Sequence, residues 1–410
     1  MKILMINKYH HITGGADTYY FQLSSLLRAK GHEVIEFCLR HPKNLFSKYS
    51  DYFVDGLTHE NWKDETIEKK VRAYINGIYN FEAKQKIKLL IEKARPDIAH
   101  IHNIFYQISP SILGPLKNAG IPIVHTLHDY QVVCASNNLY CNGKICEACR
   151  RVRYYNILRK RCYNNSLSAS FLAFSAKVIH SMFKMYHQKI DIFISPTQFL
   201  KDKVTSTAIN ESKIIVIPHP VDLSDYEPNY NFRDYVVFAG RFVRHKGILT
   251  LVRTFDGLPI KLILLGSGEL QPEIEDYIKT YRLKNVNLAG FLIGKQFQQV
   301  IKKAKFVIVP SEWYENSSMV ILESFAMAKP VIGSNIGGIP ELVSEDVGLL
   351  FEPGNIEDLR DKIATLYNND DLVRTLGKNA RAKVEKYYNP EIHYKRIIGI
   401  YEKLIHEKNG

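Results

Sequence analysis

The amino-acid sequence predicts an α/β protein with two Rossmann-like domains in tandem. In the first half of the chain, short β-branched runs alternate with amphipathic stretches, which is typical of a parallel sheet covered by helices. The segment IVIPHPVDLSDYEPNYNF then places three prolines among Asn and Asp residues, the composition of a linker. A second series of β-branched runs follows at once, so the chain carries the same organisation twice.

The first unit begins with a strand at KILMIN. A helix follows over 17–30, with apolar residues at helical spacing, and ends at Gly31. One long Lys/Glu-rich helix is expected from about Trp62 to Arg95. Further strands are expected at HEVIEF, DIAHIH, IPIVHTL and DIFISP. We expect this domain to span 1–220 and to contain a Cys-rich insertion at about 134–162.

The second unit has strand candidates at YVVFAGR, KLILLGSG, VNLAGF, FVIVPS, PVIGS and GLLF, and we expect its domain to span 232–388. The terminal stretch PEIHYKRIIGIYEKLI starts with Pro and repeats apolar residues at helical spacing. It predicts a closing helix over 389–410 that packs back toward the first domain.

Composition and charge restrict the class of protein. The 410 residues are 46% hydrophobic and 24% charged, as in soluble globular proteins. No apolar run approaches the roughly 20 residues of a membrane-spanning helix, and MKILMINKYHHITGG lacks a cleavage site. We therefore expect a cytoplasmic protein. A peripheral contact with the inner face of the membrane is compatible with this expectation.

The net charge of +13 favours anionic partners such as nucleotide diphosphates, anionic lipids or nucleic acid. Part of the excess lies in the basic segment 150–161. This segment is either a solvated face or a contact with an anionic membrane or a lipid-linked acceptor. No RNA-recognition motif accompanies it, so nucleic acid is not an expected partner.

Two glycine-containing loops of the second unit follow strands, where α/β sheets bind their ligands. In RFVRHKG, Arg241 and Lys246 are two cations that suit a diphosphate leaving group, although such a loop is often only solvent-facing. In LLGSGE, Gly266 and Gly268 let the backbone approach a nucleotide closely, although glycine turns are common.

The segment EWYENSSMVILESFAMAKPVIGSNIGGIPE contains a pair of carboxylates, Glu315 and Glu323, separated by seven residues. If a helix opens at Asn316, one carboxylate lies at its mouth and the other about two turns along, both toward a cleft. Ser317, Ser318 and Met319 would then offer backbone N–H groups to phosphate oxygens. The alternative is a helix N-terminal acid followed by an unrelated surface acid.

The motifs GRFVRHKG, LLGSGE, ENSSMVILESFAMAKPVIGS and GGIPE, with an amino-terminal GG and an HD pair, resemble glycosyltransferase family 4 over nearly the whole chain. That family has the GT-B fold, in which two Rossmann-like domains face each other across a cleft. The resemblance implies that Arg241 and Lys246 hold the donor diphosphate, that Glu323 holds the ribose and that Glu315 holds the transferred sugar. It also implies that His128 lies at the reacting sugar, and that the remaining donor contacts come from Gly14, Gly15, Gly266, Ser318 and Met319.

The same resemblance implies a retaining transfer from a nucleoside diphosphate sugar, with UDP or GDP preferred, to a glycan or lipid-linked acceptor in surface polysaccharide biosynthesis. The leaving phosphate assists deprotonation of the acceptor, and no cofactor is required, since no DxD-like motif is present. Asn316 and Ser317 stand where the family often has Gly or Pro, which leaves the sugar preference open. The alternatives are a GT-B nucleotide-sugar epimerase and a zinc-stabilised nucleic-acid-binding or scaffold protein.

Five of the six cysteines lie between Cys134 and Cys162. Two of them form CEAC, a spacing that lets two thiolates bind one tetrahedral zinc ion. A structural zinc is expected, with Cys141 as a spare, and some members of the resembling family carry a similar insertion. Free thiols or an iron–sulfur cluster are alternatives, while the expected compartment disfavours a disulfide. The expected ligands are Cys134, Cys146, Cys149 and Cys162.

Overall fold

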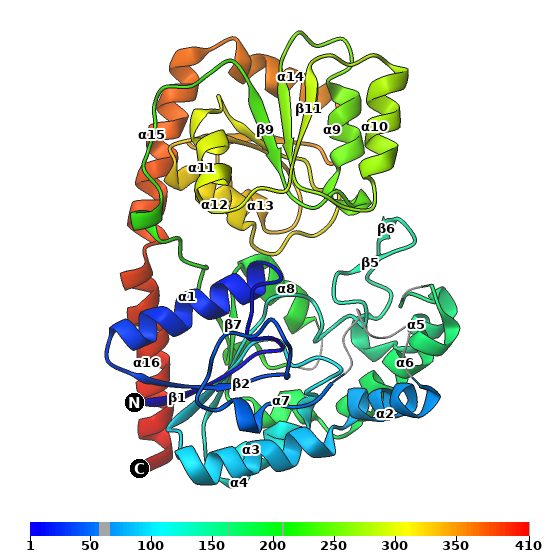
Figure 1. Cartoon of the computed structure of the whole chain (residues 1–410), viewed down its shortest axis with the longest axis vertical. Coiled ribbons are helices and arrows are strands. Elements are labelled where there is room, and N and C mark those ends of the chain that lie inside the picture. The colour runs from blue at the N-terminus through cyan, green and yellow to red at the C-terminus, as the bar shows by residue number, and fades with distance from the viewer. Residues whose placement is uncertain (57–65, 164, 207–208, 410) are drawn as a thin grey trace.

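The computed structural model describes residues 1–56, 66–163, 165–206 and 209–409, and shows two α/β domains, one above the other in Figure 1. Each has a parallel six-stranded sheet with buried apolar clusters on both faces. The predicted pair of α/β units is confirmed. In the described part of the chain, no helix combines the length and apolar character needed to cross a bilayer.

The first sheet has the order β2-β1-β3-β4-β7-β8. Its last strand ends within the segment that begins IVIPHP and was expected to be a linker, so that expectation is wrong for residues 215–216. The β-branched residues Ile214, Ile215 and Val216 favour a strand although prolines follow them. All three pair in parallel with β7. The strands are β1 (Lys2–Ile6), β2 (Glu33–Phe37), β3 (Ile98–Ile101), β4 (Ile123–Thr126), β7 (Ile192–Ser195) and β8 (Ile214–Val216).

The long helix predicted from about Trp62 to Arg95 is two helices, and residues 62–65 lie outside the described residues. The break comes at Asn80, whose extended backbone and side-chain bond to the Ala83 N–H start a new helix. The helices of this domain are α1 (Gly15–Ala29), α2 (Ile67–Ile78), α3 (Phe81–Ala94), α4 (Leu113–Asn118), α5 (Tyr155–Lys160), α6 (Leu167–Met182), α7 (Met185–Lys189) and α8 (Gln198–Thr205).

The second sheet has the order β11-β10-β9-β12-β13-β14, and each of its strands was expected from the sequence. The strands are β9 (Val236–Ala239), β10 (Leu262–Leu265), β11 (Val286–Gly290), β12 (Val307–Val309), β13 (Val331–Ser334) and β14 (Gly348–Phe351). The helices are α9 (Ile248–Thr254), α10 (Gln271–Thr280), α11 (Gly294–Lys303), α12 (Met319–Ala326), α13 (Ile339–Leu342), α14 (Ile356–Tyr367) and α15 (Asp370–Tyr387).

The last helix, α16 (Pro390–Asn409), leaves the second domain and runs along the first (Figure 1). Ile397 and Tyr401 pack in the same buried cluster as Ile3 and Met5 of β1. The Tyr401 hydroxyl also forms a hydrogen bond with the buried His100 ring. The first domain is therefore built from both ends of the chain.

Both sheets reverse their strand order at one place, between β1 and β3 in the first and between β9 and β12 in the second. In open α/β sheets, the loops at the carboxyl ends beside such a reversal form the ligand site. The loops that carry Gly15, Lys246 and Glu315 follow β1, β9 and β12 respectively.

Candidate active site between the two domains

A cavity of about 160 Å³ lies between the loops of the two domains. It is lined by six residues that the sequence singled out: Gly15, His128, Glu315, Asn316, Ser317 and Met319. The other lining residues are Ala16, Asp129, Tyr130, Asn137, His219, Trp313 and Tyr314.

Two helix N-termini meet at this cavity. In the first domain, α1 begins at Gly15 after the cap residue Gly14, and in the second, α12 begins at Met319 after Ser318. A Cβ atom added to Gly15 would lie 4.0 Å from Cγ of Met319. Because the first N–H groups of a helix have no partner within it and carry partial positive charge, this arrangement favours an anion between the helices.

Glu315 is a buried carboxylate whose neighbours keep it ionised. Burial alone would raise its pKa, but the Lys246 ammonium and hydrogen bonds from Ser311 and Trp313 outweigh that effect and lower it. Lys246 forms an ion pair with Glu315 from the loop after β9, and the Ser311 hydroxyl donates to Glu315 Oε1 over 2.7 Å. The pair places a fixed cation and a fixed anion at the second-domain side of the cavity.

The GGIPE turn holds the loop that carries Glu315. The Gly338 N–H donates to the Glu315 carbonyl over 2.7 Å. A Cβ atom on Gly338 would lie 2.1 Å from the Asn316 carbonyl oxygen, so only glycine allows this approach. Gly337 adopts a left-handed backbone with φ of +63° directly beside Glu315.

Asn316 joins the two domains and does not begin a helix, which corrects the sequence expectation, since α12 starts three residues later. Its amide donates to the His128 carbonyl over 3.2 Å, and its oxygen accepts from the Thr197 hydroxyl over 3.0 Å. The side chain is used across the domain interface and is thus unavailable for a helix cap.

Glu341 of the same turn also crosses the interface. Its carboxylate accepts the first two N–H groups of α8, from Gln198 at 2.8 Å and Phe199 at 2.6 Å. A carboxylate at a helix N-terminus is favoured by the helix dipole. This contact places α8 against the second domain beside the cavity.

The half-buried His128 ring lies in a stack of imidazoles, between His102 and the cavity-lining His219. Its Nε2 lies 2.9 Å from Nδ1 of His102, and His102 stacks on His100 in turn. Burial, together with the neighbouring imidazoles, lowers the pKa of His128 to about 3. The ring that lines the cavity is therefore neutral near pH 7.

Asp129, which the sequence analysis treated only as a companion of His128, also lines the cavity. Burial raises the pKa of its carboxyl to about 7, against the weaker opposing effects of the Gln131 N–H and Lys177. The cavity thus contains two carboxyl groups with opposite tendencies, because the pKa of Glu315 is lowered. His219 and Asn137 were not singled out, since each lies in a segment without a recognisable spacing, and Trp313 was passed over although it lies in the same segment as Glu315.

Other residues expected to bind the donor lie outside the cavity lining. Arg241 is exposed on the loop after β9. The Glu323 carboxyl forms a hydrogen bond with Tyr226, and burial raises its pKa to about 7. A Cβ atom on Gly266, where φ is +140°, would lie 1.9 Å from the Gly240 carbonyl oxygen, so this glycine permits close loop packing. The donor roles of these residues stay predictions.

The four cysteines expected to bind zinc line one separate cavity together with Cys141. Among the described residues, however, no three Cys, His, Asp or Glu side chains are placed to hold one metal ion. All six cysteines are free thiols.

Comparisons with known proteins identify the family and the fold of the chain. The family model described as Glycosyltransferase Family 4 matches residues 13–225, and the model described as Glycosyl transferases group 1 matches residues 226–383. An uncharacterized glycosyltransferase of Methanocaldococcus jannaschii is 26% identical over 390 residues, 94% of each chain. The capsular polysaccharide biosynthesis glycosyltransferase CapM of Staphylococcus aureus is 26% identical over 239 residues, 53% of this chain and 63% of CapM.

Among solved structures, HepE of Anabaena, in complex with UDP, superimposes with a TM-score of 0.70 at 16% identity, over 98% of this chain and 100% of HepE. The likeness confirms that the two α/β domains form the GT-B fold. Because the Glycosyltransferase Family 4 model covers the first domain from Thr13 onward and the group 1 model covers most of the second, the chain belongs to glycosyltransferase family 4.

Proposed function

We propose that this glycosyltransferase moves a sugar, with retention of anomeric configuration, from a UDP-sugar or GDP-sugar to a growing glycan or a lipid-linked acceptor, and releases the nucleoside diphosphate. The observation that carries the proposal is the meeting of the α1 and α12 N-termini at one cavity beside the Lys246–Glu315 pair. A diphosphate gains charge as its bond to the sugar breaks, so positive groups fixed at that place stabilise the transition state more than the ground state.

The donor binds with its diphosphate between the two helix N-termini. Lys246, and Arg241 from the same loop, supply full positive charges, so the diphosphate needs no metal ion. Glu315 accepts hydrogen bonds from hydroxyls of the transferred sugar, since its carboxylate is ionised and already oriented by Ser311. Glu323, half-buried in the second turn of α12, binds the ribose.

Retention follows if the acceptor attacks from the side that the diphosphate leaves. The bond from the anomeric carbon to the phosphate oxygen breaks, the bond to the acceptor oxygen forms, and the acceptor proton passes to the departing phosphate oxygen. His128 is neutral near pH 7 and contacts the sugar as a hydrogen-bonding group. Asp129 is the cavity group suited to the opposite outcome, because a base with a pKa of about 7 serves an inverting reaction.

The acceptor approaches along the first domain. Exposed Arg159 lies on α5, exposed Arg151 and Arg153 lie just before it, and α5 packs against α6. Tyr155 is 57% exposed, Phe171 60% and Phe183 65%. A basic and aromatic surface of this kind suits an anionic membrane that carries a lipid-linked acceptor. CapM, a capsular polysaccharide glycosyltransferase, supports a polysaccharide product.

The donor is tested by thermal shift with UDP-, GDP- and ADP-sugars. A ligand at about 100 times its Kd stabilises the folded state by about 2.7 kcal/mol. We expect one nucleotide class to raise the melting temperature, with or without EDTA. The shift should disappear in Glu323→Ala and persist in Glu357→Ala, whose carboxylate is exposed on α14. No shift with any donor contradicts the proposal.

The stereochemistry is tested by NMR of the product formed from an α-linked donor. An α-linked product, with activity retained in Asp129→Asn, supports retention. A β-linked product, with activity abolished in Asp129→Asn, shows inversion. A sugar with one ring carbon inverted, formed from the donor without any acceptor, indicates an epimerase.

A further inference from the structure

We propose that the cavity lined by cysteines binds one Zn²⁺ ion through Cys134, Cys146, Cys149 and Cys162, and that this ion braces the donor-site loop of the other domain. The site is separate from the candidate active site, and metal binding does not depend on the proposed function.

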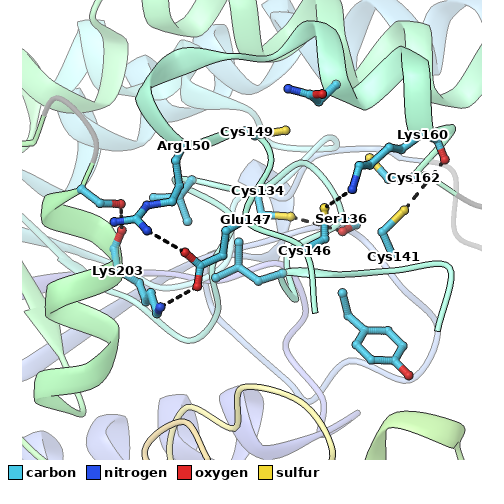
Figure 2. Close-up of a pocket in the computed structure, with 15 residues that line it drawn as sticks. Cys134, Ser136, Cys141, Cys146, Glu147, Cys149, Arg150, Lys160, Cys162 and Lys203 are labelled. Atoms are coloured by element: carbon cyan, nitrogen blue, oxygen red, sulfur yellow. Dashed lines mark hydrogen bonds and ion pairs between the residues drawn. The ribbon is translucent and has the colours of Figure 1, made fainter. Parts of the chain in front are cut away.

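The cavity is the size of a single ion. Its volume is about 20 Å³, and about 10–15 Å³ is enough for one water molecule. Five of the fifteen residues that line it are cysteines, and Figure 2 shows their sulfur atoms around a shared space. An organic ligand would not fit, whereas a monatomic cation would.

The donor atoms suit a soft metal. Thiolates bind Zn²⁺ tetrahedrally at about 2.3 Å, and the close CEAC spacing supplies two of them. The Lys160 ammonium already lies 3.4 Å from Cys146 Sγ, so a cation occupies the rim of the cavity (Figure 2). In the described residues the sulfurs do not converge on one point. To bring the four sulfurs within bonding distance of one ion, zinc binding draws the surrounding turns together and displaces the Lys160 ammonium from Cys146. Each ligand thiol releases its proton to solvent.

The spare cysteine is Cys141. It lies on the short β5 strand (Tyr140–Cys141), and its thiol contacts the Lys160 carbonyl at 3.8 Å. The hairpin of β5 and β6 (Lys144–Ile145) stands apart from the first sheet and extends toward the second domain (Figure 1). Cys141 is therefore the matched control for the four ligands, because it lines the same cavity.

Glu147, the first of the two residues between the CEAC cysteines, makes one cross-domain contact. The Tyr314 hydroxyl, next to Glu315 in the donor-site loop, donates to Glu147 Oε1 over 2.8 Å. Lys203 and Arg150 also pair with Glu147, at 2.5 and 3.0 Å. Because Glu147 is flanked by Cys146 and Cys149, an ion held by both fixes the position of its carboxylate.

A second contact, made by aromatic rings, also links the cysteine-rich segment with the second domain. The Tyr140 ring lies 5.6 Å from the His245 ring, and His245 lies 4.4 Å from the Trp313 ring. His245 neighbours Lys246, and Trp313 lines the active-site cavity. The cysteine-rich segment thus contacts both loops that carry the Lys246–Glu315 pair.

Metal content is measured first, on the purified full chain without nucleotide, so that the result is independent of donor binding. We expect about one Zn²⁺ per chain by plasma mass spectrometry, and thiolate-to-metal charge-transfer absorption after replacement by Co²⁺. Cys146→Ser and Cys149→Ser should lose the ion, while Cys141→Ser should keep it. Absence of zinc after purification with added Zn²⁺, a disulfide among these cysteines, or metal retained by Cys149→Ser overturns the proposal.

If the serine variants fail to fold, the wild-type chain still tests the site. Added Zn²⁺ should protect Cys146 and Cys149 from alkylation by iodoacetamide and leave Cys141 reactive. Equal alkylation rates with and without Zn²⁺ overturn the proposal.

The effect of the ion on the donor-site loop is tested by the fluorescence emission of Trp313. The chain has two tryptophans, so Trp62→Phe leaves Trp313 as the single reporter. Removal of zinc by a chelator should change the Trp313 emission, and Glu147→Gln should reduce that change without loss of metal. Metal binding with unchanged Trp313 emission overturns the brace.

Discussion

At the scale of single residues, the candidate site depends on a few buried charges and their partners. Lys246 and Glu315 were each singled out from the sequence, but their pairing was not, because they lie on loops after different strands and no local spacing relates them. Asp129 was missed as an ionisable group of the cavity, since its raised pKa comes from burial, which a sequence does not show.

The Lys246–Glu315 pair is expected to contribute to stability as well as to donor binding. Lys246→Met leaves the Glu315 carboxylate buried without its cation, so the free energy of unfolding should fall by about 2 kcal/mol. Arg244→Met is the matched control from the same loop. Its exposed pair with Glu273, at 3.5 Å, should contribute under about 1 kcal/mol. Urea unfolding measures both, and equal losses would show that the buried pair has no special role.

Asp129 predicts a pH-dependent stability difference. Its pKa is about 7 in the fold against a usual 3.8, so between these values the folded state binds more protons than the unfolded state. The carboxyl therefore destabilises the fold increasingly as pH rises toward 7. Asp129→Asn should raise the melting temperature more at pH 8 than at pH 5. If the difference in melting temperature between Asp129→Asn and the wild type is the same at pH 5 and pH 8, the pKa of Asp129 is not raised.

At the scale of elements, sequence patterns placed the strands well because buried parallel strands are continuous apolar runs. The sequence predictions were wrong where tertiary contacts determine the local secondary structure. Asn316 resembles a helix cap, yet it bonds to His128 and Thr197 across the interface, and α12 starts later. The β8 strand was hidden by the prolines that follow it, and the pairing that defines it is with β7.

The close approach of the GGIPE turn to the Glu315 loop predicts a strong effect of one methyl group. Gly338→Ala places Cβ 2.1 Å from the Asn316 carbonyl oxygen, so the turn or the loop must move. We expect donor affinity to fall at least tenfold, measured by titration calorimetry. In Gly399→Ala, where nothing lies within 4 Å of the new Cβ in α16, binding should be unchanged and stability should rise by up to about 1 kcal/mol.

At the scale of the whole molecule, the two-domain organisation was visible in the sequence because the same strand series occurs twice. The contacts between the domains were not, since they pair residues far apart in the chain, such as Glu341 with the α8 N-terminus. The histidines of the first domain are a further collective feature. His100 and His102 are close in the sequence, but His128 follows a different strand and Tyr401 lies on α16, so the sheet and α16 are needed to bring these rings together.

These buried histidines predict sensitivity to acid. Burial lowers the pKa to about 3 for His100 and about 4 for His125 and His393, while the unfolded value is about 6.5. Their contribution to stability is therefore complete above pH 6.5 and is lost as pH falls below it. Raised carboxyl pKa values at Asp129 and Glu323 act in the opposite direction but are fewer than the histidines.

The melting temperature should consequently fall between pH 6.5 and pH 5, and the fall should be smaller in His393→Gln. His406→Gln is a suitable control, because His406 is exposed near the end of α16. A melting temperature that is constant over this range would show that the histidines titrate normally.

The return of α16 to the first domain has a consequence for biosynthesis. The strands of the second sheet, residues 236–351, leave the ribosome as one continuous block and can fold as they emerge. The first domain emerges earlier, yet His393 and Tyr401, which bond to Tyr19 and His100, are made near the end. During translation the first domain therefore cannot complete its fold until α16 has been made. Until then the apolar side chains of β1 that α16 buries stay exposed, and a chaperone that acts on nascent chains would bind there.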